Sequence, residues 1–116
     1  MLIIDDDEMV GTVLCRALKG HDVIWSRTGK EGLDHIVAGY HFDVILCDLM
    51  MPEMTGMDLH AELSRVMPGS LDRLIFMTGG AFTPSARAFL ERIPNKIVEK
   101  PFALREMQSL VQRYVG

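Results

Sequence analysis

The stretch Ile45-Leu46-Cys47-Asp48-Leu49-Met50-Met51-Pro52-Glu53-Met54-Thr55-Gly56 decides the fold of this chain. Its beginning belongs to an apolar run over residues 44–47 that is typical of a strand buried on both faces, and an acid, Asp48, ends the run. Pro52 and Gly56 then turn the chain into a segment with helical periodicity. A carboxylate is therefore predicted at the carboxyl end of a strand, where ligands bind in open α/β sheets.

Three other predicted strands end in polar residues in the same way. Ile3-Ile4 is followed by Asp5-Asp6-Asp7, residues 74–77 are followed by Thr78-Gly79-Gly80, and Ile97-Val98-Glu99 is followed by Lys100-Pro101-Phe102. We expect these four strand ends to form one site.

Strand-like and helix-like segments alternate along the chain. Short apolar runs at residues 2–4, 23–25, 43–47, 73–77 and 96–99 indicate five strands, and amphipathic stretches at 8–19, 30–38, 57–67, 84–92 and from 104 onward indicate five helices. No Asn-Gly hairpin turn joins two strands, so right-handed crossovers should make the sheet parallel. We predict a flavodoxin-like α/β fold, a (βα)5 three-layer sandwich whose five-stranded parallel sheet has the order 2-1-3-4-5.

The helical patterns also predict which side chains face the core. These side chains are Val10, Val13, Leu14, Ala17 and Leu18 in the first helix, Leu33, Ile36 and Val37 in the second, Leu59, Leu63 and Val66 in the third, and Leu104, Met107, Leu110, Val111 and Tyr114 in the last.

Composition excludes several classes of protein. A chain of 116 residues that is 48% hydrophobic is expected to form one domain, residues 1–116, with no room for an output domain. Its net charge of −4, with scattered basic residues, argues against a nucleic-acid surface. We find no apolar run long enough for a membrane span and no signal peptide, and the two cysteines fit core positions in a reducing compartment. We therefore expect a cytoplasmic location.

Acids that meet at one point repel each other, and burial would raise their pKa values unless a cation compensates. Mg²⁺, or Mn²⁺, is the simplest compensating ion because it binds oxygen ligands and is held by one or two carboxylates. Asp6 and Asp48 suit direct ligation, the backbone carbonyl of Met50 could add a third protein oxygen, and Asp5 could hold a metal-bound water.

With the cation in place, an oxygen of Asp48 is free to attack a phosphorus atom in line and form an aspartyl phosphate. Phosphoryl transfer depends mainly on positioning and on stabilising charge. Lys100 supplies a positive charge for one phosphoryl oxygen, and the Thr78 hydroxyl can donate a hydrogen bond to another. Gly79-Gly80 leaves backbone amides accessible.

In order and spacing, these segments resemble the receiver domain of two-component response regulators over essentially the whole chain. The spacing is 42 residues from Asp6 to Asp48, 30 from Asp48 to Thr78 and 22 from Thr78 to Lys100. The resemblance implies that Asp48 accepts a phosphoryl group from the phosphohistidine of a histidine kinase or histidine phosphotransfer domain. It also implies that Asp5 and Asp6 form the acidic pair, that Thr78 and Lys100 bind the phosphoryl group, and that the Lys100-Pro101 peptide is cis.

The chain departs from the family pattern at Ile97, where the family usually has a Tyr or Phe that moves inward together with the Thr. An aliphatic side chain has no polar tip, so we expect the signal to pass through displacement of the 78–84 loop and the fourth helix. The partner-facing surface would then be the fourth helix, fifth strand and fifth helix. The segments Gly79-Gly80-Ala81-Phe82-Thr83-Pro84 and residues 97–102 resemble receiver domains that are joined to hybrid sensor histidine kinases.

Other interpretations of the same residues remain open. Asp5-Asp6-Asp7 could form a solvated turn that caps a helix. The chain could be a receiver-like interaction module that is never phosphorylated, although none of the key residues is missing. A Mg²⁺-dependent phosphatase would need a second acid two residues after Asp48, where Met50 stands. Because neither Met50 nor Gly80 can orient a water molecule, we expect the aspartyl phosphate to hydrolyse slowly.

Overall fold

Five parallel strands form one sheet in the order β2-β1-β3-β4-β5, which confirms the predicted fold. The computed structural model describes residues 1–80 and 83–115. Within these residues the strands are β1 (Leu2–Ile4), β2 (Ile24–Ser26), β3 (Ile45–Asp48), β4 (Leu74–Thr78) and β5 (Ile97–Glu99). The central strands β1, β3 and β4 are buried along their whole length, as expected for apolar strands that helices cover on both faces.

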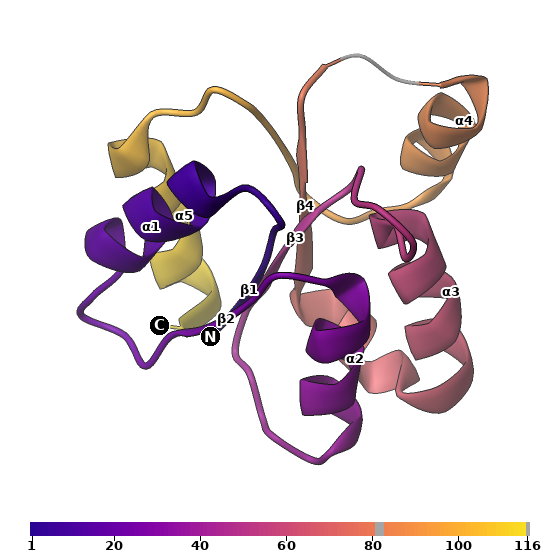
Figure 1. Ribbon diagram of the computed structural model, residues 1–116, viewed down its shortest axis with the longest axis horizontal. Helices are drawn as coiled ribbons and strands as arrows, with labels where there is room; N and C mark the ends of the chain where they lie inside the picture. Colours follow the sequence, from indigo (N-terminus) through magenta and orange to yellow (C-terminus); the bar gives the residue numbers. More distant parts are fainter. Residues whose placement is uncertain (81–82, 116) are drawn as a thin grey trace.

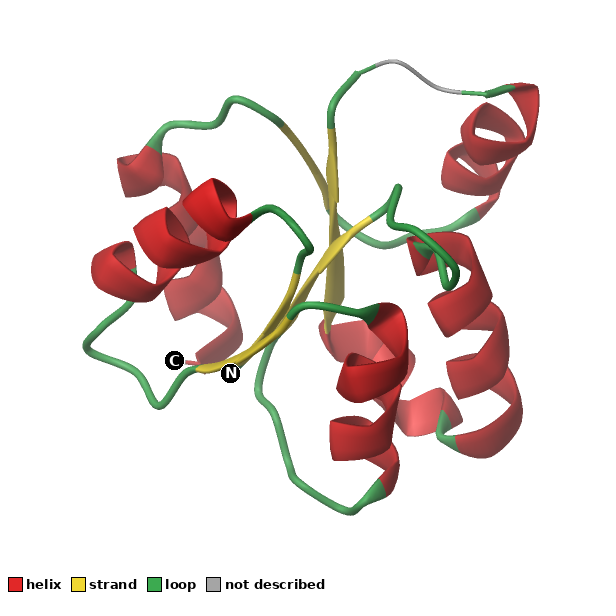
Figure 2. Ribbon diagram, in the orientation of Figure 1, coloured by secondary structure: helices red, strands yellow, loops and turns green. Residues whose placement is uncertain are grey.

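The helices cover both faces of the sheet (Figures 1 and 2). They are α1 (Glu8–Ala17), α2 (Gly29–Val37), α3 (Gly56–Val66), α4 (Pro84–Arg92) and α5 (Leu104–Val115), with a 3-10 turn η1 (Pro68–Arg73) before β4. Alternate strand residues point to opposite faces, and this produces two cores. One core joins the sheet to α2, α3 and α4, and the other joins it to α1 and α5.

Side-chain caps start four of the helices. Asp7, Thr28, Thr55 and Thr83 each accept a hydrogen bond from a backbone N–H in the first turn of the helix that follows. Thr55 and Asp58 form a reciprocal capping box at α3. Each cap stabilises its helix by about 1 kcal/mol, and these caps set where each loop at the carboxyl edge ends.

The predicted core faces are wrong at four positions. Val13, Val37, Val66 and Leu104 are each more than a third exposed. Val37 and Val66 are the last residues of α2 and α3, and Leu104 is the first residue of α5. Because the strands are only three to five residues long, the helix ends extend past the sheet that the apolar pattern would otherwise face. Val13 lies at the margin of the apolar stripe of α1, about 100° around the helix from buried Leu14.

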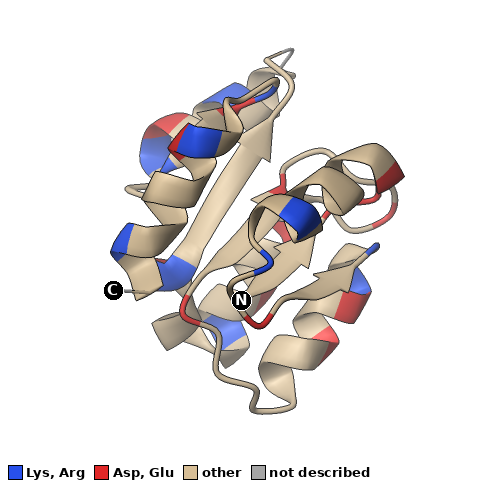
Figure 3. Ribbon diagram, turned by 90° about the vertical axis from the view of Figure 1, so that its left-hand side faces the viewer, with Lys and Arg blue, Asp and Glu red and all other residues tan. Residues whose placement is uncertain are grey.

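Lys and Arg, and Asp and Glu, occur on several helices and loops (Figure 3). Among residues 1–80 and 83–115, no helix combines the length and the apolar character needed to cross a bilayer.

Candidate functional site

The sheet order brings the predicted site residues to one edge. Asp5 and Asp6 directly follow β1, Asp48 and Thr78 are the last residues of β3 and β4, and Lys100 follows β5. In the β3–β4 pair, Asp48 lies opposite Met77, and in the β4–β5 pair Thr78 lies opposite Glu99. The loops that leave these strands lie at the same edge of the sheet (Figure 2).

Asp5, Asp6 and Asp48 form a carboxylate cluster. One oxygen from each lies within 4.8 Å of the others. Asp5 is fully buried, Asp48 is 8% exposed and Asp6 faces solvent. A group of three carboxylates that is open to solvent on one side fits a hard divalent cation that keeps several waters, because Mg²⁺ prefers oxygen ligands and dehydrates reluctantly.

Lys100 places its side-chain ammonium next to the carboxylates of this cluster. Its Nζ donates a hydrogen bond to Asp5 Oδ2 at 2.8 Å and lies 3.4 Å from Asp48 Oδ1. Its backbone N–H donates to the Thr78 carbonyl at 2.7 Å, and the Lys100-Pro101 peptide is cis, as predicted. Burial by itself would lower the pKa of Lys100, but the hydrogen bond to Asp5 and the charge of Asp48 outweigh it and raise that pKa.

Asp48 carries the electrostatic cost of the arrangement. Burial is the largest cause that raises its pKa, to about 6, and the charge of Asp5 raises it further. Lys100 opposes both effects without cancelling them. The carboxylate of Asp48 is therefore destabilised at neutral pH, and a further positive charge in the cluster would relieve it.

Thr78 brings an unsatisfied hydroxyl to the same edge. The residue is 1% exposed, and its Oγ1 has no hydrogen-bond partner among the residues that the structure describes. A buried hydroxyl without a partner costs about 1–3 kcal/mol. A ligand that carries an acceptor oxygen and binds at this strand end could satisfy the hydroxyl.

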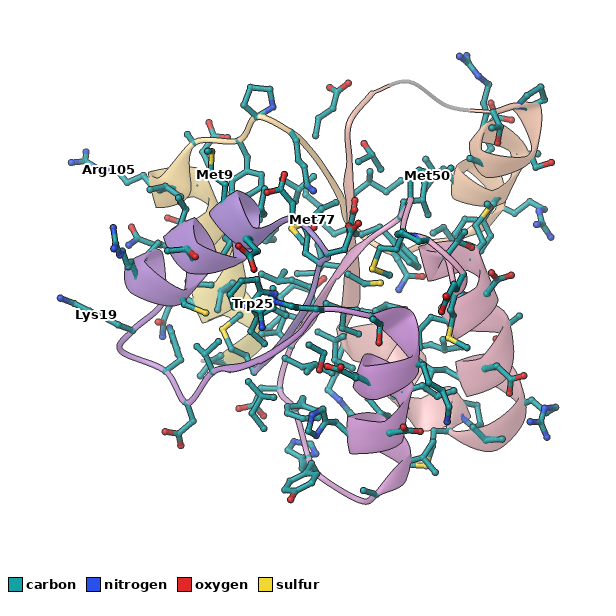
Figure 4. All side chains as sticks on the ribbon, in the orientation of Figure 1. Met9, Lys19, Trp25, Met50, Met77 and Arg105 are labelled. Carbon is teal, nitrogen blue, oxygen red and sulfur yellow. The ribbon has the colours of Figure 1, made fainter. Side chains whose placement is uncertain are left out.

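The loop after Asp48 is fixed by backbone contacts. The Leu49 N–H donates to the Met77 carbonyl at 2.9 Å, and the Gly56 N–H donates to the Leu49 carbonyl at 2.8 Å. A Cβ on Gly56 would lie only 3.0 Å from the Asp48 carbonyl oxygen, so a side chain there would push on the backbone of the closed loop. Met50 is 44% exposed in this loop (Figure 4), and the part of its carbonyl in metal binding stays a prediction.

Ile97 lies half-buried in a groove of about 410 Å³ between β4, α4 and β5. Thr78 and Leu90 also line this groove, and Arg87, Glu91 and Glu99 supply charged groups. Of the predicted 78–84 loop, Ala81 and Phe82 lie outside the described residues. The predicted signal route through this loop and α4 stays a prediction.

Two residues of the acidic loop, Asp5-Asp6-Asp7, make hydrogen bonds that the sequence patterns indicated only in part. Asp7 caps α1, accepting from the Met9 and Val10 N–H groups at 2.9 and 3.4 Å, so the capping interpretation holds for this one acid. Trp25, on β2, donates its indole N–H to the Asp5 carbonyl at 3.0 Å. No local pattern could have found this bond, because 20 residues separate the partners.

Comparison with known proteins agrees with this geometry. A family model described as the response regulator receiver domain matches residues 1–112. The chain is 34% identical over 116 residues to the DNA-binding transcriptional regulator NtrC of Azospirillum brasilense, covering 97% of this chain and 23% of that protein. It is 25% identical over 117 residues to the aerobic respiration control sensor protein ArcB of Escherichia coli (strain K12), covering 98% of this chain and 15% of that protein.

A solved structure, that of the Francisella response regulator 1452 receiver domain, is similar with a TM-score of 0.79 at 25% identity. The match covers 97% of this chain and 93% of that one. The chain thus spans less than a quarter of the two full-length relatives but nearly all of the solved domain.

Proposed function

This chain belongs to the family of response regulator receiver domains of two-component signalling, and we propose that residues 1–116 act as one such domain with Asp48 as the phosphoacceptor. The observation that carries the proposal is the contact between strand ends: the Lys100 amine lies 2.8 Å from Asp5 and 3.4 Å from Asp48. The buried hydroxyl of Thr78, one strand away from Asp48 and without a partner among residues 1–80 and 83–115, supports it further.

In the proposed reaction, a lone pair of an Asp48 carboxylate oxygen forms an O–P bond to the phosphoryl group of a donor phosphohistidine. The P–N bond breaks, and its electron pair stays on the imidazole nitrogen, which takes up a proton. Lys100 then moves its ammonium from the free carboxylates to one phosphoryl oxygen, and Thr78 donates its hydroxyl hydrogen to another. No general base is needed, because the pKa of Asp48, about 6, leaves it mostly ionised at neutral pH.

The acidic cluster would hold Mg²⁺ or Mn²⁺ through Asp6, Asp48 and the Met50 carbonyl, with Asp5 holding a metal-bound water. Such an ion would supply positive charge to the carboxylates and to the phosphoryl oxygens. The open side of the cluster, at exposed Asp6, leaves room for water and for the incoming group.

A histidine kinase or a histidine phosphotransfer domain would be the donor, in the cytoplasm. When Thr78 turns toward the phosphoryl group it leaves the groove beside Ile97, so the change should reach α4 and the face formed by α4, β5 and α5. Hydrolysis of the aspartyl phosphate should be slow, since Met50 and Gly80 offer no group to orient water.

A place beside a sensor kinase in a hybrid chain is consistent with the similarity to the sensor protein ArcB.

Acetyl phosphate with Mg²⁺ provides the test. We expect the intact mass of the wild-type protein to increase by one phosphoryl group, and the mass of Asp48→Asn to stay unchanged. Asp43→Asn is the matched control, because it removes an exposed carboxylate two residues before the same strand. It should be labelled like wild type.

The rival functions predict other results. A receiver-like interaction module would show no labelling with any donor. A phosphatase would release phosphate from esters over many turnovers. Labelling of Asp48→Asn to the wild-type extent would refute the assignment of Asp48.

A further inference from the structure

The indole of Trp25 connects the edge strand β2 to the acidic loop. Its Nε1 donates to the backbone oxygen of Asp5 at 3.0 Å, and next to it the Asp5 N–H donates to the Ser26 carbonyl at 3.1 Å. Both backbone groups of Asp5 are thus held by two consecutive residues of β2. Trp25 is partly buried and packs against the core between the sheet and α1 and α5 (Figure 4).

The residues around the indole ring pack tightly against it and fix its position. A Cβ on Gly11 would lie 2.1 Å from Trp25 Cε2 and Cζ2, so α1 can rest on the ring only because residue 11 is glycine. The Arg27 guanidinium carbon lies 4.1 Å from the ring centroid, and Arg27 also pairs with Glu8 of α1 at 3.7 Å. Helix α1 and Arg27, which directly follows β2, therefore hold the ring in one orientation.

This orientation controls the peptide that joins Asp5 to Asp6. The carbonyl that accepts the indole N–H belongs to that peptide. On the other side of Asp6, Asp7 is fixed as the cap of α1, and its N–H donates to Asp5 Oδ1 at 2.9 Å. Asp6 itself is exposed, so the anchored peptides on its two sides, and not packing of its side chain, determine where its carboxylate points.

We propose that Trp25 is a positioning residue for the divalent cation: its indole N–H holds the Asp5-Asp6 peptide so that both carboxylates face the cluster with Asp48. This inference rests on the proposed function, since it assigns a device to the same cation site. Without the indole donor the carbonyl is free to rotate, and the cation must order the loop as it binds. The loss should appear as weaker cation affinity, not as loss of the fold.

The chain contains one tryptophan, so replacing all tryptophan biosynthetically changes a single position. β-(3-Benzothienyl)alanine has the shape of tryptophan with sulfur in place of the N–H, and it removes the donor while keeping the ring packed against Gly11. We expect this protein to keep the wild-type melting temperature within a few degrees and to bind Mg²⁺ about threefold to tenfold more weakly by calorimetry, as expected for one hydrogen bond.

Two controls separate positioning from general weakening. The first is 5-fluorotryptophan, which keeps the N–H; it should leave the Mg²⁺ affinity unchanged, and its fluorine resonance should shift as Mg²⁺ is added. The second is Gln108→Leu, which removes a side-chain hydrogen bond from Gln108 Nε2 to the carbonyl of Ala17 at 2.8 Å, at the end of α1 opposite the acids. It should leave the Mg²⁺ affinity at the wild-type value.

A further readout is phosphorylation by acetyl phosphate. The benzothienyl protein should be labelled slowly at low Mg²⁺ and at the wild-type rate at saturating Mg²⁺, which a disrupted fold would not allow. Equal Mg²⁺ affinity of the benzothienyl and wild-type proteins would overturn this inference and leave the proposed function standing. Absence of Mg²⁺ binding by the wild-type protein would overturn both.

Discussion

The two sides of the site differ in how well their polar groups are satisfied. On the β1–α1 side, Asp5 makes hydrogen bonds with both carboxylate oxygens and both backbone groups, and Asp7 caps a helix. On the β4–β5 side, the Thr78 hydroxyl is buried with no partner in the described part of the chain, and an open groove lies beside Ile97. The polar groups on the β1–α1 side are therefore ordered before any ligand binds, while on the β4–β5 side the Thr78 hydroxyl is still available to form a hydrogen bond.

This difference suits the two tasks that we propose for the site, cation binding and switching. A cation site gains affinity when its ligands are already ordered, because the cation need not compensate the entropy of ordering them. A switch needs a group that gains an interaction in only one state, because a ligand shifts an equilibrium only by its differential affinity. Lys100 links the two sides through its side-chain contacts with Asp5 and Asp48 and its backbone bond to Thr78.

The largest expected effect comes from breaking that link. Lys100→Met removes the ammonium that pairs with fully buried Asp5 and nearly buried Asp48. We therefore expect the free energy of unfolding by urea to fall by about 2–4 kcal/mol. Lys30→Met is the control, because its ion pair with Asp34 is exposed on both sides and should contribute less than about 0.5 kcal/mol. Similar losses in the two variants would show that the Lys100 contacts do not stabilise the fold.

Removing the charge of Asp48 should raise the free energy of unfolding, whereas Lys100→Met should lower it. Its folded pKa, about 6, lies above the ordinary 3.8, so the folded state binds the proton more tightly and the unfolding free energy should fall as pH rises from about 4 to about 6. Asp48→Asn removes this cost and should be about 2–3 kcal/mol more stable than wild type at pH 7 without divalent cations.

The measurement for Asp48 is urea unfolding across that pH range, with and without Mg²⁺. The gap between Asp48→Asn and wild type should close toward pH 4, where wild-type Asp48 is protonated, and should shrink at pH 7 when Mg²⁺ is present. A gap that does not depend on pH would rule out the carboxylate charge as its cause.

The unsatisfied side predicts a gain on removing a polar group. Thr78→Val keeps the shape and deletes a hydroxyl that has no partner within the described residues, so it should stabilise the unphosphorylated protein by about 1 kcal/mol. The same variant should slow labelling of Asp48 by acetyl phosphate. If Thr78→Val instead lowered the melting temperature, the hydroxyl would already have a partner and the contrast between the two sides would disappear.

The satisfied side predicts an effect as small as that of Thr78→Val, with the reverse sign. Asp7→Ala removes the cap of α1, which consists of the hydrogen bonds that the Asp7 side chain accepts from the Met9 and Val10 N–H groups, so it should destabilise the protein by about 1 kcal/mol. Thermal unfolding monitored by circular dichroism would measure it, with Asp34→Ala, on the exposed face of α2, as the control. If Asp7→Ala left the melting temperature unchanged, contacts other than the cap would be what orders the acidic loop.

Much of the fold could be predicted from local pattern. The alternation of apolar runs and amphipathic stretches indicated all five strands and the helices between them, and every strand boundary was correct to within two residues. The errors were Val13, Val37, Val66 and Leu104, whose exposure depends on where helices extend beyond short strands. Periodicity reports which face of a helix is apolar but not how long a surface it will meet.

The candidate site was predictable for a related reason. Parallel strands all present their carboxyl ends at one edge, so acids, threonine and lysine that follow four strands must approach each other once the strand order is known. The carboxylate cluster and the Lys100 contacts agree with that expectation. The roles of Asp48, Thr78, Lys100 and the Met50 carbonyl in chemistry stay predictions.

By itself, then, the sequence determined the order of elements, the sheet and the edge at which the polar residues collect, because these follow from local periodicity and from chain direction. Only the tertiary structure decided which groups are paired. Lys100 bonds Asp5 across 95 residues, Trp25 holds the Asp5 carbonyl across 20, and the Thr78 hydroxyl has no partner in the part described. Hydrogen bonds depend on separations of about 3 Å between atoms, and distance along the chain carries no information about them.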